Sequence, residues 1–422
     1  MAKPELSLSS SSQAKASPFS SLSLLSLALL LPIAVTSTSD TVHLLSTPPR
    51  PRDSSAHISE RAATTIPLTV QNLCSETVWP AFASQAGTGP NVGGCELVPG
   101  AHRDFTVSTD WQGRVWGRTN CSFNAAGTGP SNLNGNNGAG RACGTGDCNG
   151  VLSCVVTGDT PVTLAEFDLA GGSSGSQTFY DLSLVDGYNL PIGLTYIPGG
   201  DPDLQDIPPN LTDAACIATA GLISTLTSDA TNASYPLPYD IRTTNSDLAG
   251  WCPWDLQLNK PTKPGDGVYP YPDDSIQRPE FDPCLSACAS SNSPSDCCTG
   301  QYDSPSACKP SLYSRQAKSV CPDAYSYAFD DMTSTFIIPT GGGWKVTFCP
   351  VGRSTNILAT FRTQLEEIAS TGKVSANILA DTKNITLIQK GEGIATHGGE
   401  RERMKMGSLG ALVVMLAWAC MW

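Results

Sequence analysis

Acidic side chains in the middle of the chain are the residues of this sequence best suited to chemistry. Glu166 lies within a β-rich run, where a buried carboxylate without a partner would be costly. Its side chain is therefore expected to reach a cleft or a cation such as Arg114. Asp181 and Asp186 follow across a strand end, where Gly187 turns the chain. Neighbouring carboxylates near an arginine can hold different protonation states, as glycoside hydrolysis requires of its two acids.

The same acids have two other interpretations. They could form a salt-bridged structural cluster, or they could bind a sugar without turning it over. Asp147 is a separate case, because a Thr-Gly-Asp-Cys sequence is more typical of a turn-capping aspartate than of a catalyst.

The sequence offers few residues or motifs for other kinds of catalytic or cofactor-binding site. The chain has four histidines, and His102 alone lies in its central part, where we expect it at the surface beside Arg103 and Asp104. Without a histidine cluster or a spare set of cysteines, we expect no metal site, and a Ser–His–Asp triad is poorly supported. The sequence has no P-loop or dinucleotide fingerprint, so we expect no cofactor.

Composition narrows the class of protein. The chain has 422 residues, 16 Cys and a formal net charge of −13, with 15% charged and 40% apolar residues. These values argue against a disordered chain, a multi-pass membrane protein and a nucleic-acid binder, which needs clustered Lys and Arg. The cysteines crowd between Cys74 and Cys349, which indicates a disulfide framework in an oxidising compartment.

Both ends of the chain resemble targeting segments. Residues 1–38 contain a short apolar run typical of a secretory signal peptide, and residues 39–63 resemble a disordered linker. A Ser-rich plastid transit peptide is the rival, but the dense cysteines favour secretion. Residues 399–422 fit a glycolipid-anchor signal, with a short tail anchor or a terminal hydrophobic helix as alternatives. Residues 353–398 between the domain and this signal resemble a stalk.

The residue pattern between the two ends of the chain changes once. From about residue 66 to 200, short β-rich runs separated by Gly, Asn and Ser predict a β-sandwich rather than βαβ units. Residues 211–221 then predict a short helix, and the Pro-rich residues 260–283 predict a long loop. Sequons that could carry glycans on a secreted surface occur at Asn210, Asn232 and Asn384.

Five separated motifs go beyond composition and follow one another in a fixed order. They are Arg114–Cys121 (RVWGRTNC), Cys143–Cys154 (CGTGDCNGVLSC), Thr163–Phe167 (TLAEF), Tyr180–Pro191 (YDLSLVDGYNLP) and Cys321–Asp331 (CPDAYSYAFDD). Together they resemble the thaumatin-like family, also called pathogenesis-related class 5, which includes osmotin. The match runs over about residues 64–352.

The resemblance implies a mainly β fold. It is a flattened two-sheet β-sandwich with a disulfide-rich helical and loop subdomain at about residues 205–330 and a small disulfide-stapled loop subdomain. It also implies an acidic cleft, with Arg118 as the nearby alternative for the arginine. The residues expected to line the cleft are Arg114, Glu166, Asp181, Asp186 and Asp330.

The resemblance further implies seven of the family's eight disulfides. The expected pairs are Cys74–Cys349, Cys121–Cys143, Cys148–Cys154, Cys216–Cys321, Cys252–Cys284, Cys288–Cys297 and Cys298–Cys308. Both halves of the eighth are missing, and we expect Ile337 and Ile338 to pack as apolar side chains in its place. Cys95 is left over, as a buried free thiol, an intermolecular partner or part of a local bridge.

Two functions fit these observations, and both belong to a monomer outside the cell. The first is an antifungal defence protein, secreted or lipid-anchored, that binds β-1,3-glucan or a microbial surface protein through the acidic cleft. The second is a weak endo-β-1,3-glucanase with Glu166 as acid and Asp181 as nucleophile or base. Inhibition of a digestive hydrolase, which some relatives perform, is a further option.

Overall fold

The computed structural model describes residues 65–130, 140–199, 202, 204–224, 234–258 and 283–383. The chain divides into two units, Met1–Ser59 and Glu60–Trp422, and every described residue belongs to the second. The predicted signal peptide, linker and anchor signal, together with Asn232 and Asn384, lie outside the described residues. Within the described ranges, no helix is both long and apolar enough to cross a bilayer.

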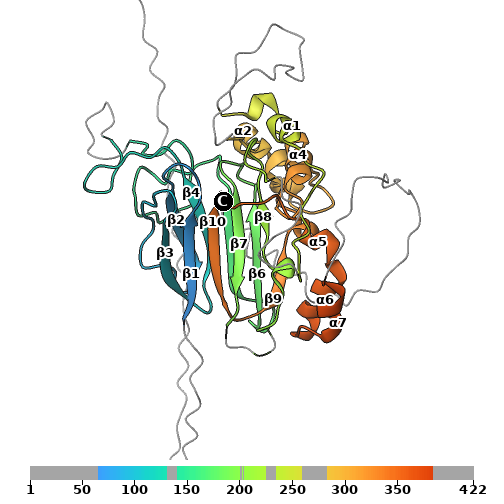
Figure 1. Cartoon of the computed structure of the whole chain (residues 1–422). Helices are drawn as coiled ribbons and strands as arrows, with labels where there is room; N and C mark the ends of the chain where they lie inside the picture. Colours follow the sequence, from blue (N-terminus) through green and yellow to red (C-terminus); the bar gives the residue numbers. More distant parts are fainter. Residues whose placement is uncertain are drawn as a thin grey trace, which may run out of the picture. The chain divides into compact units, whose positions relative to one another are not determined.

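Two five-stranded sheets form the centre of the second unit (Figure 1). The strand order of the first is β3 (His102–Ser108), β1 (Thr65–Asn72), β10 (Gly343–Phe348), β7 (Ile192–Ile197) and β8 (Ala215–Cys216). The order of the second is β2 (Trp79–Ala86), β4 (Gln112–Arg118), β5 (Leu164–Gly171), β6 (Gln177–Ser183) and β9 (Phe336–Pro339). All strand pairs are antiparallel except β1 with β10.

Aromatic side chains from both sheets pack against one another in the core. The ring of Trp344 on β10 lies 5.4 Å from that of Phe167 on β5 and 4.2 Å from that of Tyr180 on β6. Tyr196 on β7 packs against the same indole at 5.3 Å. Such contacts contribute through both buried area and ring geometry. The two sheets therefore face each other across one core, which confirms the predicted two-sheet β-sandwich.

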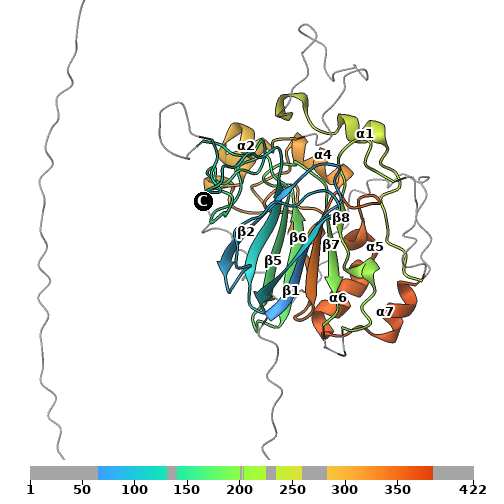
Figure 2. The same ribbon diagram turned by 60° about the vertical axis from the view of Figure 1, so that its left-hand side comes forward.

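Short helices gather at one end of the strands (Figures 1 and 2). They are α1 (Asn245–Gly250), α2 (Ala287–Ser291), α3 (Pro294–Cys297) and α4 (Leu312–Val320), with a 3₁₀ turn between α1 and α2 and another between α3 and α4. The N-caps of α2, α3 and α4 are serines whose hydroxyls accept a backbone N–H of the first turn.

The predicted helix over residues 211–221 is wrong. Only the end of a 3₁₀ turn, Pro209–Leu211, and the short strand β8 occur there. β8 pairs with β7, and Cys216 at its end is joined to Cys321 after α4. Tertiary pairing and a disulfide thus override the local helical preference.

All seven disulfides that the resemblance implies are present. The Cys74–Cys349 bridge joins the ends of the parallel strands β1 and β10 and closes a loop of 275 residues. Cys95 is a free thiol that is 4% exposed, and burial raises its pKa. Ile338 on β9 is fully buried, as expected where the eighth disulfide is missing, whereas Ile337 is only half-buried.

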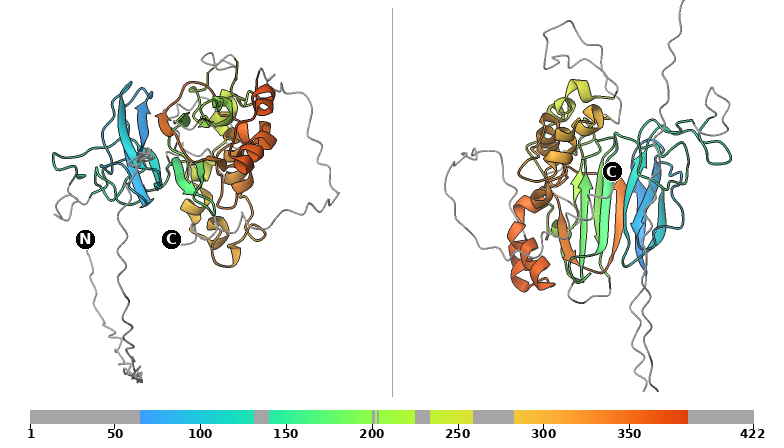
Figure 3. Two further views of the ribbon diagram at one scale, coloured as in Figure 1. Left: turned by 90° about the horizontal axis from the view of Figure 1, so that it is seen from below. Right: turned by 180° about the vertical axis from the view of Figure 1, so that it is seen from behind.

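The predicted stalk is wrong for residues 353–383, because this segment is folded against the sandwich. It contains α5 (Ile357–Thr360), α6 (Arg362–Thr371) and α7 (Ala376–Asp381), and α6 lies against the edge strand β9 (Figures 1 and 3). The apolar residues of the segment recur at helical spacing and are buried, which the sequence reading missed. They are Ile357, Leu358, Phe361, Leu365, Ile368 and Ile378.

The predicted glycan at Asn210 does not fit the fold. The side chain is 0% exposed, and its Nδ2 atom donates hydrogen bonds to the carbonyl oxygens of Pro236 (3.3 Å) and Thr382 (2.8 Å). Nδ2 is the atom that a glycan would occupy. Asn210 instead ties the end of α7 to the body of the domain.

Candidate functional site

Three polar side chains lie next to one another across three adjacent strands. Arg114 on β4 is directly opposite Glu166 on β5, and Glu166 is directly opposite Asp181 on β6. Figure 2 shows β5 and β6 side by side. Directly opposed residues project on the same face, about 5 Å apart at their Cβ atoms. Because Phe167 and Tyr180, the next positions, point into the sandwich core, this row of three lies on the opposite face of the sheet. We call Arg114, Glu166 and Asp181 the carboxylate row.

Arg114 contacts one acidic side chain and one residue of a loop. Its Nη2 atom lies 3.3 Å from Oε1 of Glu166, with the two side chains 13% and 8% exposed. Its Nη1 atom donates a hydrogen bond of 3.1 Å to Oγ1 of Thr157. Thr157 follows directly after the loop closed by the Cys148–Cys154 disulfide. The small disulfide-stapled loop therefore helps to position the arginine.

Two carboxylate oxygens of the row have no hydrogen-bond partner. They are Oε2 of Glu166 and Oδ1 of Asp181, and both residues are only 6% exposed. Buried polar atoms are nearly always paired in folded proteins, because leaving one unpaired costs free energy. An unpaired acceptor beside an ion pair therefore points to a ligand that donates hydrogen bonds.

The two acids of the row differ in their electrostatic surroundings. Burial raises the pKa of Glu166, while the guanidinium of Arg114 opposes that rise. Burial and the neighbouring Glu166 carboxylate together raise the pKa of Asp181 well above its usual range. The direct ion pair with Arg114 keeps Glu166 the more readily ionised acid of the pair, and Asp181 is left to hold the proton.

Asp186 lies near the row, and Arg118 does not belong to it. The charge of Asp186 raises the pKa of Glu166, while burial raises the pKa of Asp186 itself. Arg118 is 0% exposed and donates to the carbonyl oxygens of Trp79, Val151 and Leu152 at 2.8 to 3.0 Å. Burial lowers its pKa to about 10. Arg118 is thus a structural residue, and Arg114 is the arginine of the site.

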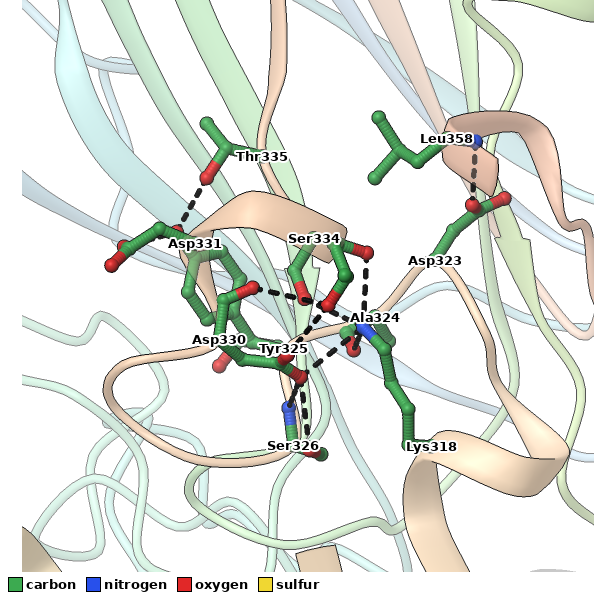
Figure 4. A network of polar contacts seen from close by, with 12 residues as sticks. Lys318, Asp323, Ala324, Tyr325, Ser326, Asp330, Asp331, Ser334, Thr335 and Leu358 are labelled. Carbon is green, nitrogen blue, oxygen red and sulfur yellow. Dashed lines mark hydrogen bonds and ion pairs between the residues drawn. The ribbon is translucent and has the colours of Figure 1, made fainter. Parts of the chain in front are cut away.

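Asp330 belongs to a separate polar network (Figure 4). Its Oδ2 atom lies 3.1 Å from Nζ of Lys318 and accepts the backbone N–H and the hydroxyl of Ser326 at 3.1 and 2.9 Å. Its Oδ1 atom accepts the hydroxyl of Thr333 at 2.6 Å. Both oxygens are therefore engaged within the domain, and the structure does not bring Asp330 into the row as predicted.

The sequence reading missed Tyr325 and Asp331. The hydroxyl of Tyr325 donates a hydrogen bond of 2.8 Å to Oδ1 of Asp331. The backbone of Tyr325 pairs with β6 at Leu182 and Leu184, on both sides of Ser183. In the sequence, the adjacent pair Asp330-Asp331 is the feature that points to this second aspartate.

Asp147 has the structural role predicted for it. Its Oδ1 atom accepts the backbone N–H groups of Ala142 and Cys143, both at 3.0 Å, and its Oδ2 atom accepts that of Gly150 at 2.7 Å. Among the described residues, no group of three or more His, Cys, Asp or Glu side chains could hold a metal ion.

The model of the thaumatin family matches residues 72–350. The chain belongs to the thaumatin family. It is 39% identical over 294 residues to pathogenesis-related thaumatin-like protein 3.5 of Cryptomeria japonica, covering 69% of this chain and 92% of that protein. It is 38% identical over 285 residues to pathogenesis-related protein 5 of Arabidopsis thaliana, covering 67% of this chain and 90% of that protein.

Among solved structures, a thaumatin-like xylanase inhibitor is 37% identical, with a TM-score of 0.24, over 30% of this chain and 74% of that one. The carboxylate row lies inside the region that the family model matches. Helices α5, α6 and α7 lie beyond its last matched residue, although they pack against the family sandwich.

Proposed function

We propose that this thaumatin-family chain is a defence protein of the cell exterior that binds β-1,3-glucan through the carboxylate row. The observation that carries the proposal is the pair of unpaired acceptor oxygens on Glu166 and Asp181. Sugar hydroxyls donate hydrogen bonds and carry no charge, so a glucan chain can satisfy both oxygens without adding to the local negative charge. Pathogenesis-related names among the relatives support the defence role.

The disulfides support a location outside the cell. Seven bridges form and persist in an oxidising compartment and would be reduced in most cytosols. We extend the proposal to the two ends of the chain. Residues 1–38 direct secretion, and residues 399–422 direct attachment of a lipid anchor.

Pelleting with insoluble β-1,3-glucan tests the binding. We expect the wild-type protein to pellet and Glu166→Gln to bind roughly tenfold or more weakly, because the variant loses the ion pair that orients Arg114 and one charged acceptor. Glu96→Gln, at an exposed position outside the row, is the matched control and should pellet like the wild type. Equal pelleting of Glu166→Gln and wild type would overturn the proposal.

The different environments of the two acids favour hydrolysis as a second candidate. A glycosidase needs one protonated and one ionised carboxyl group, and the ion pair with Arg114 selects Glu166 as the ionised one. The roles favoured by the geometry are therefore the reverse of those predicted from the sequence, with Asp181 as proton donor. Release of reducing sugar from a soluble β-1,3-glucan that disappears in Asp181→Asn and in Glu166→Gln would support it, and activity that survives either substitution would exclude it.

A further inference from the structure

We infer that Asn120 carries an N-linked glycan, and that formation of the Cys121–Cys143 disulfide limits how often this glycan is attached. Residues 120–122, Asn-Cys-Ser, have the Asn-X-Ser pattern of an acceptor site for N-glycosylation. The inference rests on the proposed function for the secretory route alone, because the chain meets the glycan transferase on that route. It does not involve the carboxylate row.

Asn120 lies at the surface of the domain, in contrast to Asn210. It follows the end of β4 by two residues, and both Asn120 and Ser122 are exposed. Within the described ranges, no residue forms a hydrogen bond with the side-chain amide of Asn120 or with the hydroxyl of Ser122. The amide nitrogen of Asn210, by contrast, already donates two hydrogen bonds inside the fold. Of the two sequons in the described part of the chain, Asn120 is therefore the one that can bear a sugar.

The backbone at Asn120 separates a glycan site from an ordinary turn. Asn120 has a φ of 50°, in the left-handed region that asparagine adopts more readily than most residues with a Cβ atom. Its carbonyl oxygen accepts the backbone N–H of Gly144 at 3.2 Å. Such a turn explains an asparagine at position 120 but makes no demand on position 122, whereas a glycan requires both Asn120 and Ser122. A glycosylated asparagine also keeps the backbone that the turn needs.

The neighbouring turn leaves room for the modified side chain. A Cβ atom on Gly144 would lie 3.3 Å from Cβ of Asn120 and 3.6 Å from its Nδ2 atom. Because residue 144 is a glycine, no side chain from that position crowds the amide. The sugar can therefore extend from Nδ2 into solvent without displacing a neighbour.

The reaction transfers an oligosaccharide from a lipid pyrophosphate carrier. Nδ2 of Asn120 forms a bond to the anomeric carbon of the first sugar, and the bond from that carbon to the pyrophosphate oxygen breaks. The lipid pyrophosphate leaves with the electron pair, and the amide nitrogen loses one proton to a base of the transferase. Nothing is oxidised or reduced in this step.

The disulfide of the middle residue sets the time available for this reaction. Cys121 is joined to Cys143, which follows it by 22 residues. At about 5–20 residues per second, Cys143 is synthesised roughly 1–4 s after Cys121. Once the bridge forms, Asn120 is fixed against Gly144 and no longer presents the extended segment that a transferase binds. Sugar transfer and disulfide formation therefore compete, and we expect a mixture of modified and unmodified protein.

Peptide mapping of the full chain, recovered from a eukaryotic secretory host, tests the glycan. We expect enzymatic release of N-glycans to convert a fraction of Asn120 to Asp, while Asn210 in the same sample stays Asn. Ser122→Ala should abolish the conversion at position 120, and it keeps the asparagine that the turn favours. Ser122→Thr retains an acceptor hydroxyl and is the matched control. Secreted wild-type protein with Asn120 unmodified, or conversion that survives in Ser122→Ala, would overturn the inference.

Removing the second cysteine tests the competition. We expect the modified fraction of Asn120 to rise in Cys143→Ser, measured in total cell extract so that poorly folded protein is included. Cys308→Ser removes a bridge that forms long after the sequon has passed the transferase, so it controls for the general effects of a free thiol. An equal modified fraction in wild type and Cys143→Ser, or an equal rise in both cysteine variants, would exclude the role of the disulfide.

Exchanging the N-terminal segment separates this inference from the proposed function. In a second form of the full chain, residues 1–38 are replaced by the signal peptide of a known secreted protein. If this form alone is modified at Asn120, residues 1–38 do not direct secretion, and the assignment of the glycan stands. If this form is secreted with Asn120 unmodified, the inference is wrong even where the native chain is secreted.

Discussion

Two partly buried ion pairs of similar length differ in how completely the groups around them are hydrogen-bonded. Arg114 and Glu166 are 3.3 Å apart, and Lys318 and Asp330 are 3.1 Å apart. In the second pair, Lys318 also donates to the carbonyl oxygens of Ala324 and Thr333 and to the hydroxyl of Ser334. In the first pair, Glu166 keeps an unpaired oxygen and lies opposite a second acid with another unpaired oxygen. Burial and distance alone therefore do not separate a structural ion pair from a ligand site, whereas hydrogen-bond satisfaction does.

The two ion pairs differ because their surrounding residues come from different parts of the chain. The network around Lys318 and Asp330 is built from one short stretch, residues 318–334, which can close its own hydrogen bonds as it folds. The carboxylate row is assembled from three strands that are distant in sequence. The sheet fixes those side chains in position without supplying partners for all of them. Buried polar atoms without partners are typical of functional sites, and their cost is offset by stability elsewhere in the domain.

Breaking the satisfied pair should give the largest loss of stability. Lys318→Met removes the counter-charge of Asp330 and leaves three further acceptors without their donor. We expect the free energy of unfolding to fall by about 3–5 kcal/mol. Urea unfolding with the disulfides intact measures it.

The matched control lies on the same helix. Arg315 on α4 is exposed and donates to the carbonyl oxygen of Pro310 at 2.7 Å. Arg315→Met should cost less than about 1 kcal/mol, as is usual for surface substitutions. Equal losses of unfolding free energy in the two variants would show that the buried contacts of Lys318 stabilise the fold no more than those of an exposed arginine.

A second satisfied carboxylate should give an intermediate effect. Asp323 is 1% exposed and accepts the backbone N–H groups of Ile357 (2.8 Å) and Leu358 (2.9 Å) at the start of α5 (Figure 4). Asp323→Ala leaves both groups buried without a partner, and we expect a loss of about 2–3 kcal/mol. Asp323→Asn keeps an acceptor and should lose less. Hydrogen exchange of the Ile357 and Leu358 amides is the direct measurement, and continued protection in Asp323→Ala would contradict the assignment.

The sequence predicted the parts of this molecule that depend on local pattern and motif order. Alternating β-rich runs predicted the sandwich, and the motif resemblance implied Arg114, Glu166, Asp181 and all seven disulfides. What it missed depends on long-range contacts. The buried face of α6 becomes apparent only when the helix lies against β9, and the helix expected over residues 211–221 loses to sheet pairing.

The choice between Asp330 and Asp331 could not be made from the sequence either. The two residues are identical and adjacent, and their roles differ only because Lys318 reaches one and Tyr325 reaches the other. Both contacts depend on how α4 and the loop after it fold against β6. Asn210 is similar, since only the path of α7 makes its side chain inaccessible.

The smallest expected effect is also the sharpest test of the unsatisfied row. The pKa of Asp181 is raised by burial and by Glu166, so folded protein retains a proton that the unfolded chain loses above its usual pKa of 3.8. Where the unfolded state binds fewer protons than the folded state, stability falls as pH rises.

We therefore expect wild-type stability to decrease from about pH 4 towards neutrality, by at most about 1.4 kcal/mol per pH unit for this group. Asp181→Asn removes this share of the slope and should therefore be more stable than the wild type at pH 7, whereas the two proteins should be equally stable near pH 3. Asp303→Asn, in an exposed turn, controls for the loss of one negative charge. If Asp181→Asn destabilises the protein at pH 7 as strongly as Asp323→Ala does, the Asp181 carboxylate is satisfied after all, and the contrast between the two ion pairs disappears.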